Sequence, residues 1–152
     1  MNKKGILRLN LNFRRMKEID IPEIIALAKT TPSVAVSEKT RFWTEEELQG
    51  WITKSNDPLI IAETNGEIAG FILARIHHPT HNGIIENLMI KTKYQRKGIG
   101  ARLLQQCLKQ LKVQNVVFVY TLIHLEDINV IEFVRKNGFR QGYKFNWFER
   151  EL

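Results

Sequence analysis

An Asn-Gly pair between two apolar segments places the strongest constraint on how this chain folds. Residues 59–63 (LIIAE) and 68–76 (IAGFILARI) are apolar segments of strand length, and Asn65-Gly66 lies between them. Both residues readily adopt the positive φ values that a two-residue type I′ turn requires. The pattern therefore predicts a β-hairpin, and residues 84–90 (IIENLMI) predict another strand after it.

Helix-start signals precede the hairpin. Residues 6–14 (ILRLNLNFR) alternate apolar and polar side chains and predict a first strand. Asp20, followed by Pro22, predicts a helix whose free N–H groups the Asp20 carboxylate accepts, and which stops before Pro32. A second helix is expected to begin at Thr44, because Glu47 stands at the spacing of a capping box.

The second half of the chain alternates helical and extended patterns. A helix with one apolar stripe is expected after Gly100, and residues 116–123 are apolar on both faces, which predicts a central strand. A short helix from about Asp127 to Gly138 and a terminal strand over residues 143–150 complete the pattern. We expect an α/β fold with one mixed sheet covered by helices, forming a single domain over residues 1–152.

Composition limits the classes of function. The 152 residues carry a formal net charge of +7, but the basic residues are spread along the chain without a block of interleaved aromatics. We therefore expect no nucleic-acid partner. No segment approaches the roughly 18 apolar residues of a membrane span, and no signal peptide is recognisable. The single cysteine, Cys107, fits a reducing compartment, so we expect a cytoplasmic protein with no membrane partner.

The segment YQRKGIGARLL lies where a loop is expected to turn into a helix. The first turn of a helix has unpaired N–H groups and a positive dipole end, which together favour an anion. Gly98 and Gly100 let the backbone approach a phosphate closely, and Arg96 and Lys97 add cationic donors. The alternative is a tight turn with solvated charges. The segment matches neither the dinucleotide fingerprint nor a P-loop.

In its context this segment resembles the acyl-CoA loop of the GNAT superfamily of N-acetyltransferases. The spacing Gln-x-x-Gly-x-Gly follows a strand ending in NLMI and precedes an amphipathic helix, and the segments FRRMKEID, GEIAGFI and FVRKNGF extend the resemblance. The resemblance implies a GNAT-like α/β (α+β) fold whose mixed central sheet is mostly antiparallel and flanked by helices. It also implies acetyl-CoA as co-substrate, without a metal.

The resemblance also implies where acetyl-CoA binds. The pyrophosphate is expected on the backbone N–H groups of Arg96, Lys97, Gly98, Ile99, Gly100 and Ala101. The pantetheine arm is expected to pair with main-chain groups of Leu88, Met89 and Ile90, like an added strand. An exposed N–H near Leu88 would polarise the thioester carbonyl.

Glu86 is the candidate general base. It lies in an apolar strand near the expected thioester and matches a glutamate that several GNAT subfamilies use. An alkyl ammonium with a pKa of about 10.4 must lose a proton before it attacks, and a nearby carboxylate can accept it. The alternative is a glutamate at a strand edge that points to solvent.

The chain departs from the family pattern at the general acid. The slot of the usual tyrosine is Val134, which cannot donate a proton; Tyr120 is a substitute, unless it is a buried core residue. The asparagine that commonly contacts CoA aligns with Asp127, which is alternatively a helix N-cap, and Asn129 lies nearby.

Other candidate residues have simpler explanations. The histidines His77, His78 and His81 match no standard zinc site and are expected in a solvated loop. His124 is expected to be partly buried, with help in proton transfer near pH 7 as the alternative. Cys107 is expected in the core, and the aromatics Phe42, Trp43 and Trp51 are expected either to pack or to line an acceptor pocket.

These residues predict an enzyme that moves an acetyl group from acetyl-CoA to an amine by direct attack on the thioester. The alternative is a CoA-binding or nucleic-acid-binding regulatory domain on the same fold, without turnover. The sequence leaves the acceptor open among polyamines, amino acids, aminoglycosides and protein N-termini or lysines. A homodimer through the terminal strand is a further expectation.

Overall fold

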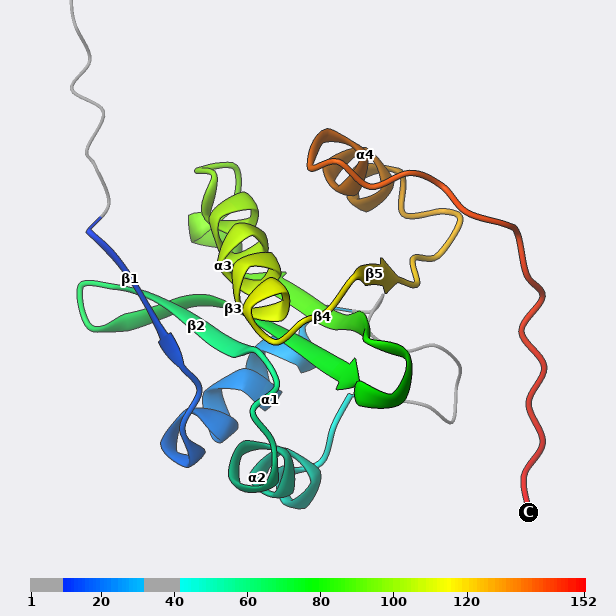
Figure 1. The fold of residues 1–152 in the computed structure, drawn as a ribbon. Helices are drawn as coiled ribbons and strands as arrows, with labels where there is room; N and C mark the ends of the chain where they lie inside the picture. Colours follow the sequence, from blue (N-terminus) through cyan, green and yellow to red (C-terminus); the bar gives the residue numbers. More distant parts are fainter. Residues whose placement is uncertain (1–9, 32–41) are drawn as a thin grey trace, which may run out of the picture. The chain divides into compact units, whose positions relative to one another are not determined.

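The computed structural model describes residues 10–31 and 42–152. Internal contacts divide the chain into a first unit that ends at Leu122 and a second unit, Ile123–Leu152. Each unit is described by itself below, and Figure 1 shows the course of the chain. The expectation of a single domain over residues 1–152 stays a prediction.

The first unit is built on a sheet of five strands in the order β1-β2-β3-β4-β5. The strands are β1 (Leu11–Arg15), β2 (Leu59–Thr64), β3 (Glu67–His77), β4 (Asn82–Ile90) and β5 (Phe118–Thr121). Neighbours pair antiparallel except β4 and β5, which are parallel. The mixed, mostly antiparallel sheet is confirmed. The hairpin is also confirmed, because Asn65 (φ 52°) and Gly66 (φ 74°) both take positive φ values between β2 and β3.

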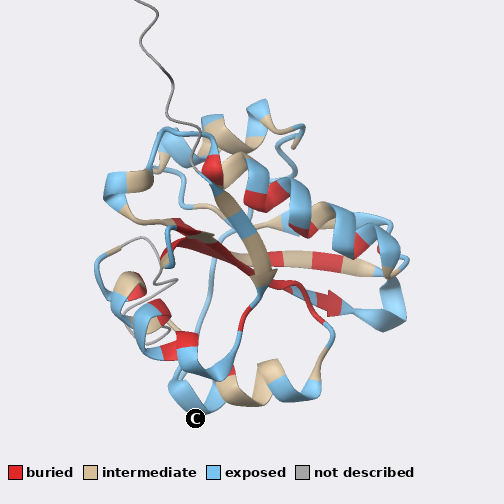
Figure 2. Cartoon of the chain, turned by 90° about the vertical axis from the view of Figure 1, so that its left-hand side faces the viewer, coloured by how far each residue is buried: buried red, intermediate tan, exposed pale blue. Residues whose placement is uncertain are grey.

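Helices cover both faces of this sheet (Figure 1). One face carries α1 (Ile21–Lys29) and α2 (Glu45–Lys54), whose apolar side chains share a core with β2, β3 and β4. The other face carries α3 (Ile99–Val113), which contacts β2, β3 and β4. Figure 2 shows the buried residues gathered along the strands and the inner sides of the helices. No helix in the described ranges has the length and apolarity to cross a membrane.

The two helix starts differ in how well the sequence predicts them. At α2 the capping box is confirmed: Thr44 Oγ1 accepts the Glu47 N–H at 3.2 Å, and the Thr44 N–H donates to Glu47 Oε2 at 2.8 Å. At α1 the helix begins directly after Asp20, as predicted, but its first N–H groups make no bond to the Asp20 carboxylate. The Asp20 carboxylate accepts the Lys17 N–H and two bonds from Arg14, because Asp20 ends a 3₁₀ turn and already has helical dihedrals.

The position predicted for residues 116–123 is wrong in the described part of the chain. Strand β5 is the last strand of the sheet, not a central one, and it pairs only with β4. Phe118 and Tyr120 are 59% and 41% exposed. Apolar side chains on both faces favour burial, but a central position also needs a second neighbouring strand, which the pattern of this segment alone cannot supply.

The predicted strand over residues 143–150 is also wrong. These residues form no helix or strand, and Tyr143, Phe145 and Phe148 are highly exposed. Alternation gives a segment two distinct faces, but a strand needs main-chain partners, and the described residues of the second unit contain no strand. At the other end of the chain, β1 begins at Leu11, and residues 6–9 of the predicted first strand lie outside the described residues.

The second unit contains α4 (Ile128–Lys136), which matches the predicted helix. Its end is defined by Gly138, with φ 91°. The Phe139 N–H donates to the Val134 carbonyl at 3.0 Å and the Gly138 N–H to the Arg135 carbonyl at 3.1 Å. This pair of bonds is a Schellman motif, which glycine at this position favours.

An ion network ties the loop after β4 to the rest of the first unit. Glu67, at the start of β3, accepts bonds from Lys93 Nζ at 2.7 Å, Tyr94 Oη at 2.9 Å and Lys91 Nζ at 3.1 Å. Lys91 also pairs with Glu23 of α1. These bonds hold the residues just before the QRKGIG segment against the hairpin and α1.

We expect Gly70→Ala to destabilise the protein by about 1–3 kcal/mol, because a Cβ at this position would overlap with residues of β4. A Cβ on Gly70 would lie within contact distance of the Met89 carbonyl oxygen and 2.5 Å from Ile90 Cδ1. Urea unfolding monitored by circular dichroism measures the change. The control is Gly50→Ala in α2, where nothing lies within 4 Å of the new Cβ. It should stabilise the helix by about 0.5–1 kcal/mol, and equal effects of the two variants would mean that the close approach of β3 and β4 does not require glycine at position 70.

We expect Glu67→Gln to lower the stability at pH 7 and to lose this effect in acid. Hydrogen bonds from Lys93, Tyr94 and Lys91 lower the pKa of Glu67 from 4.5 to about 2. A lowered carboxyl pKa stabilises the folded state fully above the unfolded value and loses this effect as pH falls toward the folded value. The difference in unfolding free energy between wild type and variant should therefore shrink between pH 4.5 and pH 2.

Glu132→Gln, which changes an exposed glutamate in the middle of α4, is the control for that experiment. Its stability difference from wild type gives the effect of removing a glutamate charge outside the network over the same range. A Glu67→Gln difference that stayed constant from pH 7 to pH 3 would show that the network does not depend on the carboxylate charge.

Candidate active site

A β-bulge in β4 determines where Glu86 points. Leu73 of β3 pairs with Asn87 and Ala74 pairs with Ile85, so Glu86 is the extra residue without a partner on β3. A bulge re-aims side chains that regular alternation would send to opposite faces. Here Glu86 lies 3.5 Å from Arg75, and Asn87 accepts a bond from Trp43 at 2.9 Å.

The Glu86 carboxylate is partly buried and lightly paired. Its side chain is 22% exposed, and its distance to the Arg75 guanidinium is longer than a strong hydrogen bond. Burial raises the pKa of Glu86 above its ordinary value, and the positive charge of Arg75 partly opposes this rise. A raised pKa makes this carboxylate a stronger proton acceptor than an ordinary glutamate. The structure thus does not support the alternative of a fully solvated edge glutamate.

Strand β4 loses its partner on one side just after the bulge begins. Strand β5 pairs only with Asn82–Ile85, so the rest of β4 has no strand on that side among the described residues. The Lys91 N–H donates to the Ala69 carbonyl at 2.9 Å, and this bond sets the alternation of the antiparallel ladder with β3. The alternation turns the main-chain groups of Leu88 and Ile90 away from β3.

The other main-chain groups near the open edge are engaged. Met89 pairs with Phe71, and the same alternation turns its main-chain groups toward β3. The Ile90 carbonyl accepts a bond from the Gln95 side chain at 3.0 Å. Of the three residues expected to line a bound pantetheine arm, Leu88 presents its main chain most openly.

The QRKGIG segment leads into an uncapped helix start. Gly98 is the N-cap of α3, with φ 78°; no side chain caps the helix, and its first turn contains no acidic residue. Arg96 also has a positive φ of 60°, and Arg96, Lys97 and Gly98 are exposed. The first N–H groups of this 15-residue helix therefore have no acidic side chain beside them in the first turn. This arrangement fits a bound phosphate.

Two further candidates are Tyr120, for the general acid, and Asp127, for a contact with CoA. Tyr120 is exposed and stacks on Phe118 with ring centroids 6.1 Å apart, so the explanation of a buried core tyrosine is wrong. Asp127 is the N-cap residue of α4, as the alternative held, although its side chain makes no capping bond. Asp127 and Val134 belong to the second unit, and the contact of Asp127 with CoA stays a prediction.

The simpler explanations hold for several other residues. Cys107 is fully buried on α3, and burial raises the pKa of its thiol to about 12, which confirms core packing. His77, His78 and His81 are exposed, and His77 Nδ1 lies 2.7 Å from Thr80 Oγ1. His124 is exposed rather than partly buried, so that expectation is wrong.

Sequence reasoning missed Arg75 and the partners of the two tryptophans. Arg75 stands in the apolar segment FILARI, so the argument that singled out Glu86 in IIENLMI applies equally to it. The contacts of Trp43 with Asn87 and of Trp51 with Asp57 join residues 44 and 6 positions apart. No local pattern predicts the first of these contacts, because it depends on the bulge.

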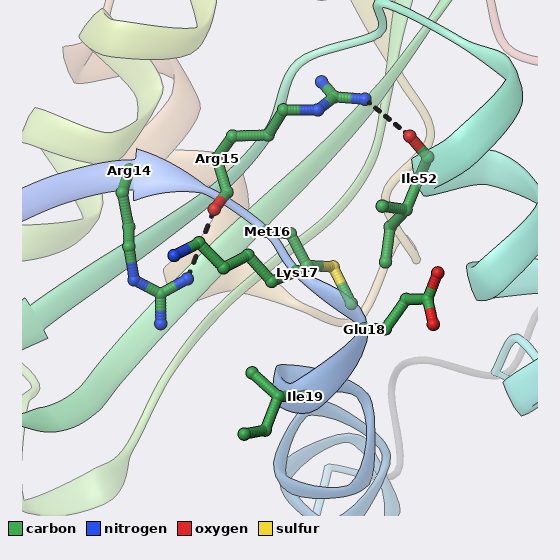
Figure 3. Close-up of a pocket in the computed structure, with 7 residues that line it drawn as sticks. All are labelled: Arg14, Arg15, Met16, Lys17, Glu18, Ile19 and Ile52. Carbon is green, nitrogen blue, oxygen red and sulfur yellow. Dashed lines mark hydrogen bonds between the residues drawn. The ribbon is translucent and has the colours of Figure 1, made fainter.

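A separate hollow lies at the β1 edge of the first unit. Its volume is about 660 Å³, and Figure 3 shows its lining residues, which are Arg14, Arg15, Met16, Lys17, Glu18, Ile19 and Ile52. Both arginines are occupied: Arg14 binds Asp20 and Glu63, and Arg15 donates to the carbonyls of Ile52, Ser55 and Asp57. The hollow includes neither Glu86 nor the QRKGIG segment.

Comparisons with known proteins agree with this geometry. An N-alpha-acetyltransferase of Sulfurisphaera tokodaii is 30% identical over an alignment of 92 residues, and the match covers 53% of this chain and 55% of that relative. Ard1 of Thermoplasma volcanium has a TM-score of 0.74 at 20% identity and covers 88% of this chain and 84% of its own.

Two further solved structures share the fold. The PaiA N-acetyltransferase of Thermoplasma acidophilum, in complex with coenzyme A, has a TM-score of 0.74 at 23% identity, covering 87% of this chain and 91% of its own. An aminoglycoside acetyltransferase from an uncultured soil metagenomic sample has a TM-score of 0.73 at 20% identity, covering 93% and 96%. The sequence profile of the acetyltransferase (GNAT) family matches residues 21–139. The chain belongs to the GNAT family of acetyltransferases.

Proposed function

We propose that this protein transfers an acetyl group from acetyl-CoA to an amine. The observation that carries the proposal is the bulge of β4, which places a partly buried carboxylate, Glu86, beside the point where β4 and β5 separate. Membership of the GNAT family supports the same reaction class.

The protein holds acetyl-CoA with main-chain groups. The N–H groups of residues 96–101, at the uncapped start of α3, bind the pyrophosphate, and Leu88 and Ile90 face the pantetheine arm. The Leu88 N–H polarises the carbonyl of the acetyl group. Acetyl-CoA supplies that group as a thioester, which an amine can attack directly.

Glu86 takes the proton of the acceptor. An alkyl ammonium is mostly protonated at pH 7 and cannot attack until it loses a proton. The partial burial of Glu86 raises its pKa and so makes it a better proton acceptor than an exposed glutamate. The acceptor is a small molecule or a peptide that bears an amine.

Three further expectations concern a regulatory role without turnover, a homodimer and the location in the cell. Nothing in the described residues or in the comparisons favours the alternative of a regulatory binding domain without turnover. A homodimer and a cytoplasmic location stay predictions; the dimer was expected through a terminal strand that residues 143–150 do not form.

We expect Glu86→Gln to lower kcat/KM at pH 7 by about 10²-fold or more, because general-base catalysis commonly contributes about 10²–10⁴-fold. The gap should narrow as pH rises toward the pKa of the acceptor ammonium, since the amine then loses its proton without help. Release of free CoA with a panel of amines measures the rate. Unchanged turnover at pH 7 would exclude Glu86 as the base, and unchanged thermal stabilisation by CoA would show that the variant still binds it.

We expect Gly98→Ala to raise KM for acetyl-CoA about fivefold to tenfold. Gly98 has φ 78° and nothing lies within 4 Å of a new Cβ, so alanine introduces backbone strain without a clash. That strain moves the N–H groups at the start of α3. The matched control is Gly66→Ala in the β2–β3 turn, with φ 74° and equally open space. It should lower stability by a similar amount and leave KM unchanged; equal KM effects would mean that the loop does not bind the co-substrate.

A further inference from the structure

Two tryptophans and two charged side chains form a cluster on the sheet face that carries α2. The Arg75 guanidinium lies 5.2 Å from the ring centroid of Trp43 and 5.4 Å from that of Trp51. The two indoles meet edge to face with centroids 5.1 Å apart. Glu86 lies 3.5 Å from the same guanidinium. We refer to Trp43, Trp51 and Glu86 as the indole cage.

The walls of the indole cage are fixed by hydrogen bonds. Trp43 Nε1 donates to Asn87 Oδ1 at 2.9 Å, and Trp51 Nε1 donates to Asp57 Oδ2 at 2.6 Å. Asp57 is itself buried, and its other carboxylate oxygen accepts the Ile76 N–H at 3.1 Å. The indole faces are therefore held in place whether or not a cation lies between them.

Arg75, in contrast, is held loosely. Its side chain is 49% exposed, and its ion pair with Glu86 is longer than a normal hydrogen bond. An ion pair with a half-exposed arginine and no short hydrogen bond contributes little to stability. The guanidinium can therefore leave the indole cage, and the main contacts that it gives up are those with the two indole faces.

The indole cage has the chemistry of a cation site. Cations bind the faces of indole rings within about 6 Å of the centroid, and aromatic cages recognise ammonium ligands in this way. A neighbouring carboxylate adds charge attraction. An anion in the same place would meet two negative ring faces and a carboxylate, so the cluster disfavours recognition of an acidic group by Arg75.

We propose that the indole cage is the subsite for the ammonium group of the acceptor, and that Arg75 occupies it in the free protein as an internal competitor. The proposal rests on Glu86 as the base of the proposed acetyl transfer. An acceptor ammonium that displaces Arg75 comes to lie beside Glu86, which then accepts its proton. Because Arg75 competes for the same site, an acceptor needs further contacts elsewhere on the protein in order to displace it. The preferred acceptors are cations at neutral pH.

The test measures binding without acetyl-CoA, so that its outcome does not depend on turnover. The probe is tert-butylammonium, and tert-butanol is its neutral counterpart of nearly equal shape. Binding is followed by the indole N–H signals of Trp43 and Trp51 in nitrogen-15 NMR spectra, assigned with single Trp→Phe variants. In Arg75→Gln, the dissociation constant for tert-butylammonium should be at least tenfold lower than in wild type, with no such gain for tert-butanol.

Two further variants separate the cage from general charge effects. Arg102→Gln removes another arginine that lies over an aromatic ring, 5.1 Å from the centroid of Phe13, and should leave probe binding at the wild-type value. Arg75→Gln combined with Trp43→Phe should lose much of the gain. Circular dichroism checks that each variant is folded.

Equal affinity of wild type and Arg75→Gln for the probe would overturn the proposal. It would also be overturned if succinate shifted the wild-type indole signals and Arg75→Gln abolished that shift, since Arg75 would then bind anions. Loss of turnover in Glu86→Gln with no cation binding in Arg75→Gln would keep the proposed reaction and reject the cage. Cation binding in Arg75→Gln without any acetyl transfer would keep the cage and reject the proposed reaction.

Discussion

Strand β4 pairs with β3 from Asn82 to Ile90 except at the bulged Glu86, whereas among the described residues only four of its residues pair with a strand on the other side. The arrangement of the candidate site follows from this asymmetry. The ladder with β3 holds the strand on one side, while the end of β5 leaves main-chain groups of Leu88 and Ile90 without a strand neighbour among the described residues. The bulge lies at the same point and turns Glu86 toward α2. In the proposed reaction, one irregular strand thus serves two tasks, with main-chain groups that bind the co-substrate at its edge and the proton acceptor on its face.

The loop after β4 extends the same separation. The first turn of α3, into which this loop leads, contains no acidic residue that would compete with a phosphate. The negative partner of the loop, Glu67, lies instead at the start of β3 and binds Lys91, Lys93 and Tyr94 before the glycines are reached. The cations nearest to the sheet are therefore neutralised, whereas Arg96 and Lys97 remain exposed beside the uncapped N–H groups.

Local signals predicted the parts of the fold that depend on local chemistry. The Asn65-Gly66 turn, the Thr44–Glu47 capping box and the Gly138 helix end all follow from the dihedrals or bonds of a few neighbouring residues. Predictions that required a distant partner were less successful. The terminal strand lacks a ladder partner in its unit, and Asp20 is bound by Arg14 instead of capping α1. Periodicity describes the faces of a segment but does not identify its neighbours.

The candidate site divides in the same way. Glu86 and the glycine loop stand out in the sequence because a charge in an apolar strand and glycines before a helix each need a reason. The indole cage does not stand out, because Trp43, Trp51 and Arg75 come from three separate segments, and the bulge that places Glu86 among them has no signature in IIENLMI. The sequence thus indicated which types of residue the site contains, but not that the residues of the indole cage lie close together.

The buried thiol of Cys107 has a practical consequence. It is the one cysteine of the chain, its side chain is fully buried, and burial raises its pKa to about 12. Because the thiolate is the reactive form, the folded protein should be almost invisible to thiol-specific dyes. A colour reaction that counts sulfhydryl groups therefore reports liberated coenzyme alone, and the same dye signals unfolding as soon as the core around α3 opens.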